Sequence, residues 1–538
     1  MRHTFVGQLL YGAHRDHSLK MDLRGIKRLF SILAAALFTG TVVQAQVVTP
    51  WMTKGDQSVL LQAQAPISSF TPYSGGGTAV LVDTSAQFQS IDGFGFCLTQ
   101  GSAEVINGLN GPTKANLLNE LFTPSGLNIT MLRISIGASD LSNSTYSYNE
   151  APGDVNMTQF SLAGPDSIHL IPLLQEILAI NPSIKILATP WTAPTWMKTN
   201  GSWKGGRLSS SYYPAYSQYF VKYLQAMDAY GISIWGITPQ NEPENPWNEP
   251  SMLMNTGEQT NFINNHLGPA IAASGYAPKI IAFDHNCDNT SYPISVLNNS
   301  AYVDGAAFHM YAGNISALST VKNATGKNVY FTEQYTDVNG DFNGDLGWHM
   351  ENVIAGSLNN WSKCVLEWNL ATDATHGPHT PGGCQDCLGA LTINDSTDYD
   401  INVSYYIIGH VSKFVQPGAV RIGVTTNSSK LLVTGFKNPN GTLTVIAYNY
   451  YGGANDAENT QLVLGTGKID FSIPPRTAVT FAIDPSGPIG LAPIPSIKER
   501  QLLRTINLLG QEVDFAPNIP LIQIFSDGSQ ERIIQLDE

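Results

Sequence analysis

Cysteine is scarce in this sequence, with 5 among 538 residues, so a small fold held together by many disulfides is excluded. Charged residues make up only 13% of the chain, and basic residues are in the minority, with 28 Lys and Arg against 42 Asp and Glu. Without a basic excess to neutralise phosphates, no nucleic-acid partner is expected. The sequence does contain 43% hydrophobic residues, which allows a large core and excludes a globally disordered chain.

No apolar run is long enough for a membrane span, which needs about 20 residues. The run near the N-terminus, residues 29–38, follows Lys27 and Arg28 and precedes Val43-Gln44-Ala45, a small-x-small cleavage pattern. Residues 1–45 are therefore predicted to be a signal peptide, with a membrane anchor as the alternative. We expect a secreted or cell-surface protein, the periplasm included, with no integral membrane span.

Signals for a metal or an organic cofactor are also missing, because the HExxH, phosphate-loop and dinucleotide-binding patterns do not occur. Cys384 and Cys387 form a single CxxC pair in a Gly-rich segment, without the second pair or the histidines that a zinc site needs. In an exported protein, a local disulfide is the better interpretation of this pair. The sequence therefore predicts no metal and no cofactor.

Residues 91–415 alternate short β-rich apolar runs with longer stretches that have the periodicity of helices. Eight such runs are found, at 91–96, 129–136, 184–188, 233–237, 279–283, 305–308, 328–331 and 364–368. The alternation predicts an α/β fold, a (β/α)₈ TIM barrel, with a doubly wound sheet as the alternative.

Both flanks of the predicted barrel show strand patterns. Residues 47–90 contain short stretches in which apolar and polar residues alternate. Residues 416–485 show the same alternation in segments separated by turns such as Asn440-Gly441. We expect the two flanks to form one β-sandwich side domain, because the ends of a domain often lie close together. Residues 486–538 are predicted to be a Pro-rich linker and a C-terminal β segment.

Two glutamates, Glu242 and Glu333, follow the predicted fourth and seventh strands, where TIM barrels place their active sites. Glycoside cleavage requires such a pair, with one carboxyl protonated and the other ionised, so their environments must hold the two pKa values apart. Asn241 stands beside Glu242 and could bond a sugar hydroxyl. The alternative is that both are ordinary surface glutamates.

Other predicted strand ends carry residues that suit a sugar ligand. Aromatic rings present flat faces to the C–H groups of a sugar ring, and Asp and Asn side chains bond hydroxyl groups. The predicted substrate-binding set is Asp140, Trp191, Asn241, His309, Tyr311 and Trp368.

Taken together, these motifs resemble glycoside hydrolase family 30, the glucosylceramidase-like and β-1,6-glucanase-like enzymes. The resemblance runs through about residues 88–485, and its most specific stretches are 89–96, 132–142, 189–200, 240–243, 331–335 and 368–370. It implies a retaining double displacement on O-glycosyl bonds, with Glu242 matching the acid/base and Glu333 the nucleophile. Phe96-Cys97 and Met310 depart from the residues usual in the family, which puts the shape of the substrate pocket in question.

The function that this resemblance implies is a secreted retaining β-glycoside hydrolase that cleaves β-glucosidic bonds, with endo-β-1,6-glucanase as the first choice. The substrate would be a β-glucan or a glucosyl lipid. The alternatives are a glucosylceramidase or another exo-β-glycosidase, an inverting barrel hydrolase, and a non-catalytic carbohydrate-binding surface protein. The C-terminal end, 507–513 with Asp527-Gly528, resembles the sorting domain of the type IX secretion system, with an ordinary terminal β hairpin as the alternative.

Overall fold

The computed structural model describes residues 46–453, 455–484, 502–507, 511, 513, 521–525 and 530–533. The signal peptide predicted for residues 1–45 and the linker predicted after residue 485 lie outside these residues. Within the described ranges, every helix falls short of the length and hydrophobicity of a membrane span.

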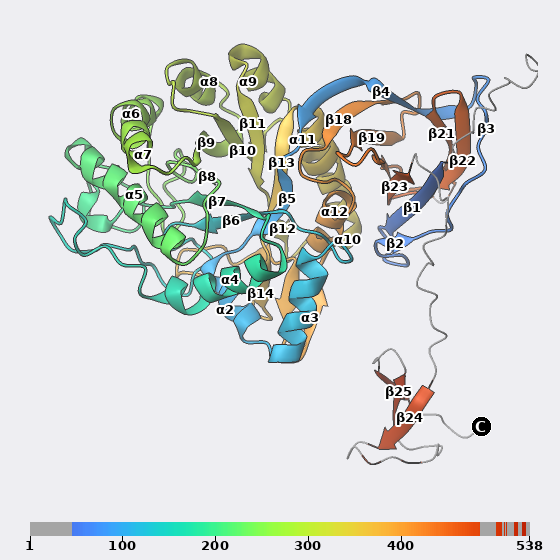
Figure 1. Ribbon diagram of the computed structural model, residues 1–538, viewed down its shortest axis with the longest axis horizontal. Coiled ribbons are helices and arrows are strands. Elements are labelled where there is room, and N and C mark those ends of the chain that lie inside the picture. The colour runs from blue at the N-terminus through green and yellow to red at the C-terminus, as the bar shows by residue number, and fades with distance from the viewer. Residues whose placement is uncertain are drawn as a thin grey trace, which may run out of the picture. The chain divides into compact units, whose positions relative to one another are not determined.

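Parallel strands close into a barrel in the order β10-β11-β13-β5-β6-β7-β8-β9 (Figure 1). In chain order they are β5 (Gly93–Cys97), β6 (Met131–Ser135), β7 (Lys185–Thr189), β8 (Gly236–Ile237), β9 (Lys279–Cys287), β10 (Gly305–Gly313), β11 (Asn328–Glu333) and β13 (Ser362–Asn369). Each strand overlaps one of the eight predicted runs. The barrel is therefore confirmed and the doubly wound sheet is excluded, because β13 pairs with β5 and closes the ring.

The interior of the barrel is filled by side chains such as Met131, Leu187, Ile281, Tyr330 and Leu366, all fully buried. Both faces of the strands are covered, which is why they read as continuous apolar runs rather than as alternating ones.

Helices cover the outside of the barrel (Figure 1). They are α2 (Gln100–Asn107), α3 (Gly111–Phe122), α4 (Ile171–Ile180), α5 (Tyr213–Ala229), α6 (Thr256–Phe262), α7 (Gly268–Ser274), α8 (Ser291–Asn298), α9 (Ala317–Thr325), α10 (Phe342–Trp348), α11 (Ser357–Asn359) and α12 (Val403–Ser412), with π-helical turns η1 (Asp166–Leu170), η4 (Ile263–Leu267) and η5 (His349–Gly356). Helix α3 shows the local cause: the Asn110 side chain caps its first turn, and Leu117, Leu118, Leu121 and Phe122 form the stripe that it buries.

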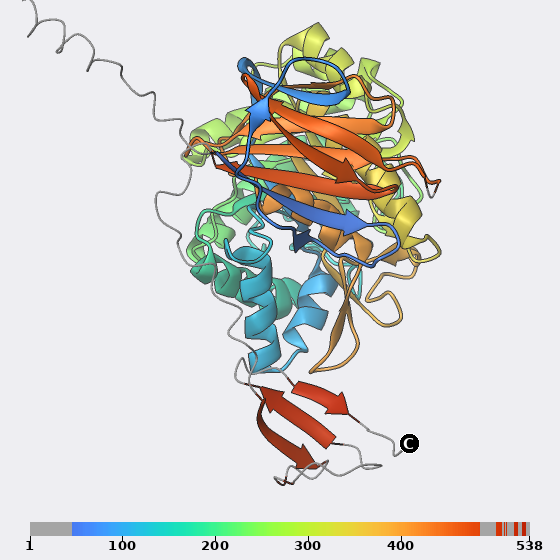
Figure 2. The ribbon, with the colours of Figure 1, turned by 90° about the vertical axis from the view of Figure 1, so that its right-hand side faces the viewer.

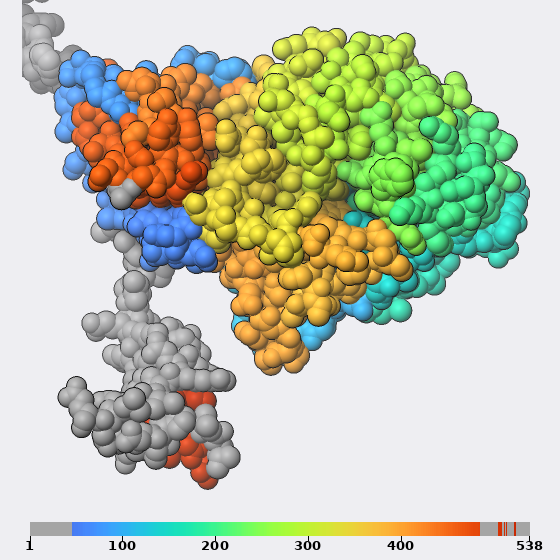
Figure 3. All heavy atoms as spheres, turned by 180° about the vertical axis from the view of Figure 1, so that it is seen from behind, coloured from blue at the N-terminus to red at the C-terminus, as the bar shows by residue number. Residues whose placement is uncertain are grey.

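A second sheet combines the two flanks of the barrel in the order β2-β1-β23-β20-β19-β18-β4-β21-β22-β3. Its strands are β1 (Val47–Lys54), β2 (Gln62–Ala63), β3 (Thr71–Pro72), β4 (Thr78–Ser90), β18 (Val420–Thr426), β19 (Leu431–Lys437), β20 (Leu443–Asn449), β21 (Glu458–Leu464), β22 (Gly467–Ile473) and β23 (Thr477–Asp484). Figure 2 shows the late orange strands β23, β20, β19 and β18 lying between the early blue strands β1 and β4, and Figure 3 shows both sets forming one surface beside the barrel. This sheet has its own core, which includes Val48, Val80, Leu462, Val479 and Phe481.

The side sheet and the barrel meet at helix α12, where His410 is fully buried. The Thr480 hydroxyl of β23 donates its proton to the backbone carbonyl of His410. The same hydroxyl oxygen lies 2.8 Å from Nδ1 and therefore accepts a hydrogen bond from the Nδ1–H group. The Thr53 hydroxyl of β1 lies 2.9 Å from Nε2 and accepts from the Leu61 amide, so it donates to the ring. Burial lowers the pKa of His410 to about 3, and the ring is therefore neutral.

Short strands complete the chain. They are β12 (Thr336–Asp337) paired with β15 (Cys387–Leu388), β14 (Ala371–Asp373), β16 (Leu391–Ile393) and β17 (Tyr399–Ile401) in one small sheet, and β24 (Leu502–Asn507), β25 (Leu521–Phe525) and β26 (Gln530–Ile533) in another.

Candidate active site

The two predicted carboxyls lie at the same end of the barrel. Glu333 is the last residue of β11, and Glu242 follows β8 in the next turn. Three atoms lie within 4.8 Å of one another: a carboxylate oxygen of Glu242, a carboxylate oxygen of Glu333 and a ring nitrogen of His309. Glu242 and Glu333 are each only 6% exposed, so both carboxyls are largely removed from water.

These carboxyls border a cavity of about 230 Å³. It is lined by Asp140, Glu242, Asn245, Asn248, Asn286, Tyr311, Glu333, Tyr335, Trp368, Cys384 and Cys387. Of the six predicted substrate contacts, Asp140, Tyr311 and Trp368 therefore line the cavity. The other three, Trp191, Asn241 and His309, are not among its lining residues.

The backbone at Glu242 has a φ of 45°, an uncommon conformation for a residue with a side chain. Its amide donates to the carbonyl of Asp284 at 2.9 Å, and its own carbonyl accepts from the Asn245 amide at 2.9 Å. The neighbouring loop and β9 therefore hold Glu242 in this turn. Backbone strain of this kind is concentrated at functional sites.

Arg133 is the residue on which the site is built. Its side chain points inward from β6 and is fully buried. It donates to Glu333 Oε2 at 2.5 Å, to Asn241 Oδ1 at 2.7 Å and to Asp284 Oδ2 at 3.0 Å. The side-chain oxygen of Asn241 is therefore engaged by this guanidinium.

Two tryptophans stack beside Arg133. Its guanidinium lies 4.8 Å from the ring centroid of Trp191 and 5.8 Å from that of Trp368. The two indole rings are 5.4 Å apart, and Trp191 is only 1% exposed. Trp191 therefore supports Trp368, which is the ring that faces the cavity.

Sequence reasoning gave no role to Arg133 or Asp284. Both are charged residues within or next to apolar strand runs, and a buried charge is costly unless it is paired. That signal could have identified them. It could not have identified Asn245, Asn248 and Tyr335, which line the cavity from loops, or Asn286, which lines it from the end of β9.

His309 lies between carboxylates. Its Nδ1 is 3.2 Å from Glu242 Oε1 and 3.6 Å from Glu333 Oε1, and its Nε2 is 3.2 Å from Asp284 Oδ1. Burial alone would lower the pKa of His309, but these three carboxylates raise it to about 10. Both ring nitrogens therefore carry protons, and each faces a carboxylate oxygen.

The pKa values of the two glutamates are moved in opposite directions. Burial would raise the pKa of Glu242, but the hydrogen bond and charge of His309 hold it below its ordinary value. Burial raises the pKa of Glu333, and the charges of His309 and Arg133 oppose this only in part. The sequence-based expectation was a protonated Glu242 and an ionised Glu333. In the ligand-free protein the two pKa shifts have the opposite directions, because His309 bonds Glu242 rather than Glu333.

Asp140 and Tyr311 present polar groups to the cavity. The Tyr311 hydroxyl donates to Glu333 Oε1 at 3.1 Å. Asp140 Oδ1 is buried without a hydrogen-bond partner, and burial together with the charges of Glu333 and Glu242 raises the pKa of Asp140 to about 7. A buried oxygen without a partner is suited to a ligand hydroxyl.

A disulfide joins Cys384 to Cys387 in the cavity wall, as the sequence suggested. Strand β15, which begins at Cys387, pairs with β12 just beyond Glu333. On the other side, the Thr380 amide donates to the Asp140 carbonyl at 2.9 Å. A side chain at Gly383 would approach that same carbonyl to 2.1 Å, so only glycine fits there. The loop therefore holds Asp140 and the chain after Glu333 together.

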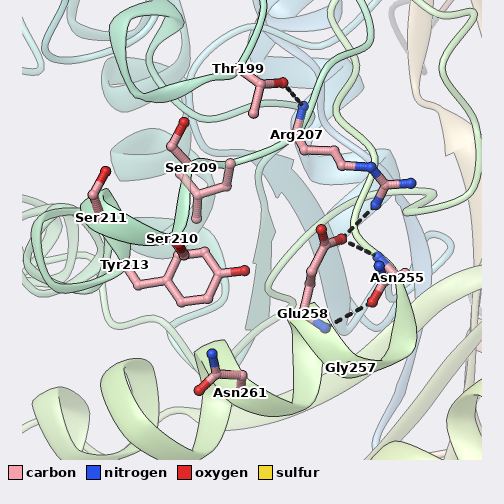
Figure 4. Close-up of a pocket in the computed structure, with 11 residues that line it drawn as sticks. Thr199, Arg207, Ser209, Ser210, Ser211, Tyr213, Asn255, Gly257, Glu258 and Asn261 are labelled. Atoms are coloured by element: carbon pink, nitrogen blue, oxygen red, sulfur yellow. Dashed lines mark hydrogen bonds and ion pairs between the residues drawn. The ribbon is translucent and has the colours of Figure 1, made fainter.

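A larger depression of about 640 Å³ lies elsewhere and shares no lining residue with this cavity (Figure 4). Its polar groups are partners of one another: Arg207 bonds Glu258 at 2.6 Å, and Asn255 and Glu258 form the capping box of α6. These groups serve helix α6, and we assign no ligand to the depression.

A closed barrel whose strand ends bring two buried glutamates to one cavity has the arrangement that glycoside hydrolysis requires. The chain matches the glycosyl hydrolase family 30 TIM-barrel domain over residues 91–415 and the family 30 beta sandwich domain over residues 418–481. It belongs to glycoside hydrolase family 30, as its motifs suggested.

Known proteins support this membership. The chain is 35% identical to endo-1,6-beta-D-glucanase neg1 of Aspergillus fumigatus, over 74% of this chain and 86% of that protein. It is 30% identical to putative glucosylceramidase 1 of Caenorhabditis elegans, over 76% of this chain and 84% of that protein. Among solved structures, the endo-beta1,6-glucanase BT3312 is 35% identical, with a TM-score of 0.76 over 81% of this chain and 98% of that one.

Proposed function

We propose that this glycoside hydrolase is a retaining endo-β-1,6-glucanase. The observation that supports retention is the approach of Glu242 and Glu333 to within 4.8 Å. Retaining enzymes hold their carboxyls about 5–5.5 Å apart, whereas inverting enzymes leave about 6.5–9.5 Å for a water molecule. The linkage is supported by the names of the relatives at 35% identity, and glucosylceramidase activity is the second candidate because of the relative at 30%.

In the first step, a carboxylate oxygen of Glu333 attacks the anomeric carbon, and Glu242 gives its proton to the departing glycosidic oxygen. This yields a covalent glycosyl-enzyme and releases one part of the glucan with a new hydroxyl. In the second step, Glu242 takes a proton from water, whose oxygen replaces Glu333 at the anomeric carbon. Arg133 and Tyr311 direct Glu333 through their hydrogen bonds to its two oxygens.

In the ligand-free protein the pKa of Glu242 is held below its ordinary value, so the first step requires a proton to be retained on Glu242 when the substrate is bound. The negative charge of an ionised Glu333 acts in that direction. Once Glu333 is esterified, that charge is gone and the positive His309, 3.2 Å from Glu242, favours an ionised Glu242. Glu242 is then ready to act as the base of the second step.

The proposal includes the location and organisation of the protein. Export is supported by the signal-peptide pattern of residues 1–45, and a secreted enzyme would meet polysaccharide directly. We assign catalysis to residues 91–415, and a supporting role to the side domain of residues 47–90 and 416–485.

The test uses purified full-length protein with β-1,6-glucan, β-1,3-glucan, xylan and glucosylceramide. We expect internal cleavage of β-1,6-glucan into oligosaccharides, and NMR should show the β anomer as the first product. The α anomer appearing first would contradict retention. Activity on glucosylceramide alone would assign the second candidate function, and binding to glucan without turnover on any β-glycoside would identify a carbohydrate-binding protein.

A further inference from the structure

The loop between β8 and α6 forms the wall of the cavity beside Glu242. The side-chain Nδ2 of Asn245 donates to Glu242 Oε2 at 2.7 Å, and the side-chain Nδ2 of Asn248 donates to the same oxygen at 3.5 Å. Both asparagines line the cavity. The loop therefore contacts the proposed acid/base on one side and borders the cavity on the other.

Trp247 stands between these two asparagines and is 75% exposed. Its backbone is held by the loop, because its backbone N–H donates to Asn245 Oδ1 at 2.9 Å. Trp247 is not itself among the residues that line the cavity, whereas Trp368, which lines it, is 3% exposed. A large aromatic ring left in water gains stability when a partner covers it, and flat aromatic faces suit the C–H face of a sugar.

The chemistry of the reaction says which sugar would reach this ring. Glu242 must protonate the oxygen that departs, so the sugar carrying that oxygen leaves past the Glu242 side of the cavity. The residues that hold Glu242 from the loop, Asn245 and Asn248, are therefore next to the leaving part of the glucan. Trp247 is the aromatic side chain of that same loop segment.

Building on the proposed function, we propose that Trp247 is the stacking platform for the sugar unit on the leaving-group side of the scissile bond. A glucan chain entering the cavity would place its cleaved unit against Trp368 and the next unit against Trp247. In the second step the same platform would hold an acceptor sugar. Trp247 would then set the preference for polymers over small glucosides.

The test compares Trp247→Ala and Trp247→Phe with the unchanged full-length protein on two substrates. β-1,6-Glucan has a sugar as its leaving group, whereas gentiobiosyl fluoride has a leaving group too small to reach Trp247. We expect Trp247→Ala to lower kcat/KM for the glucan about tenfold, to leave the fluoride within about twofold, and to be largely rescued by Phe. Tyr230→Ala, at an exposed aromatic residue that ends α5, should change neither substrate.

A second readout is the ratio in which the glycosyl-enzyme reacts with an acceptor sugar or with water. With methyl β-glucoside added as acceptor, Trp247→Ala should give several-fold less transfer product relative to hydrolysis. Equal losses on glucan and fluoride would mean that Trp247 only positions Glu242, and no loss on either would remove it from substrate binding; both results overturn the proposal. If the unchanged protein hydrolyses the fluoride but not β-1,6-glucan, the linkage assignment fails, and the transfer ratio still tests Trp247.

Discussion

Two buried histidines show how differently the cavity and the junction between the barrel and the side sheet are built. His309, which holds the two glutamates of the cavity, faces carboxylates on both ring nitrogens, and its pKa is raised to about 10. His410 at the junction faces the hydroxyls of Thr53 and Thr480, and its pKa is lowered to about 3. Both rings are fully buried, so their partners and not their depth decide their charge.

The comparison distinguishes the cavity, whose residues suit catalysis, from the junction, whose residues hold the barrel and the side sheet together. The cavity concentrates charges that are costly to bury and leaves polar atoms such as Asp140 Oδ1 without partners. At the junction, each polar atom of the His410 ring has a neutral partner. Most of the following changes act on one region and should leave the other unchanged, and the last lies outside both; they run from the largest expected effect to the smallest.

Glu333→Gln should lower kcat on β-1,6-glucan by at least about 10⁴-fold, because an amide cannot form the covalent glycosyl-enzyme. Thermal unfolding of the variant, followed by circular dichroism, should still show one folded protein. The matched control is Glu244→Gln, an exposed glutamate bonded to Asn289, which should retain activity. Unchanged turnover in Glu333→Gln would contradict the assignment of the nucleophile.

Glu242→Ala should cost about 10²–10⁴-fold on the glucan, because its sugar leaving group needs a proton. On a dinitrophenyl β-glucoside, whose leaving group departs without one, the first step should be far less affected. Pre-steady-state release of the phenol measures that step directly. Equal losses on the two substrates would argue against a proton-donor role.

His410→Gln should remove a pH dependence from the stability of the junction. Because the folded-state pKa of His410 is about 3 and the ordinary value is 6.5, the unfolded chain binds a proton first as the pH falls below 6.5. Stability is therefore present above that pH and declines below it, by about 2 kcal/mol at pH 5. Urea unfolding at pH 7 and pH 5 measures this difference, which should be absent in the variant.

His309→Gln is the control with the opposite sign. Because its folded-state pKa of about 10 lies above 6.5, the stability that His309 contributes is complete below pH 6.5 and is lost as the pH rises towards 10. The variant should therefore keep the difference between pH 7 and pH 5 that His410→Gln loses. The same pH response in both variants would contradict the contrast between the two histidines.

Arg207→Gln in the depression of Figure 4 should have the smallest effect. The ion pair of Arg207 with Glu258 joins side chains that are 41% and 28% exposed, so its loss should cost less than about 1 kcal/mol. Activity on β-1,6-glucan should stay within about twofold. A larger loss of activity would connect the depression to the cavity.

The sequence predicted the barrel well because strands buried on both faces read as unbroken apolar runs. Even β8, only Gly236–Ile237, falls within a predicted run. The strand ends likewise indicated where Glu242 and Glu333 would meet. Arg133 was missed because one charge within an apolar run looks like an interruption until its partners, far away in the chain, are known.

The cavity wall was predictable only in part. Trp191 and Trp368 look alike in the sequence, yet one supports the other, and nothing in their neighbours shows which ring faces the ligand. The asparagines of the loop after β8 have no periodic pattern, so their aim depends on the turn at Glu242. The reversed pKa directions depend on His309 lying nearer to one carboxyl than the other, a difference of a few tenths of an ångström.

The pairing of β1 with β23, along the whole length from Val47 opposite Asp484 to Lys54 opposite Thr477, has a consequence for how the molecule assembles. Strand β1, the first strand of the described residues, meets β23 only after every barrel strand has been made. Such distant pairing is slow, so the barrel should acquire its structure first and the side sheet last. Until then β1 has only the short strand β2 beside it, and its other edge is exposed to pairing with another chain.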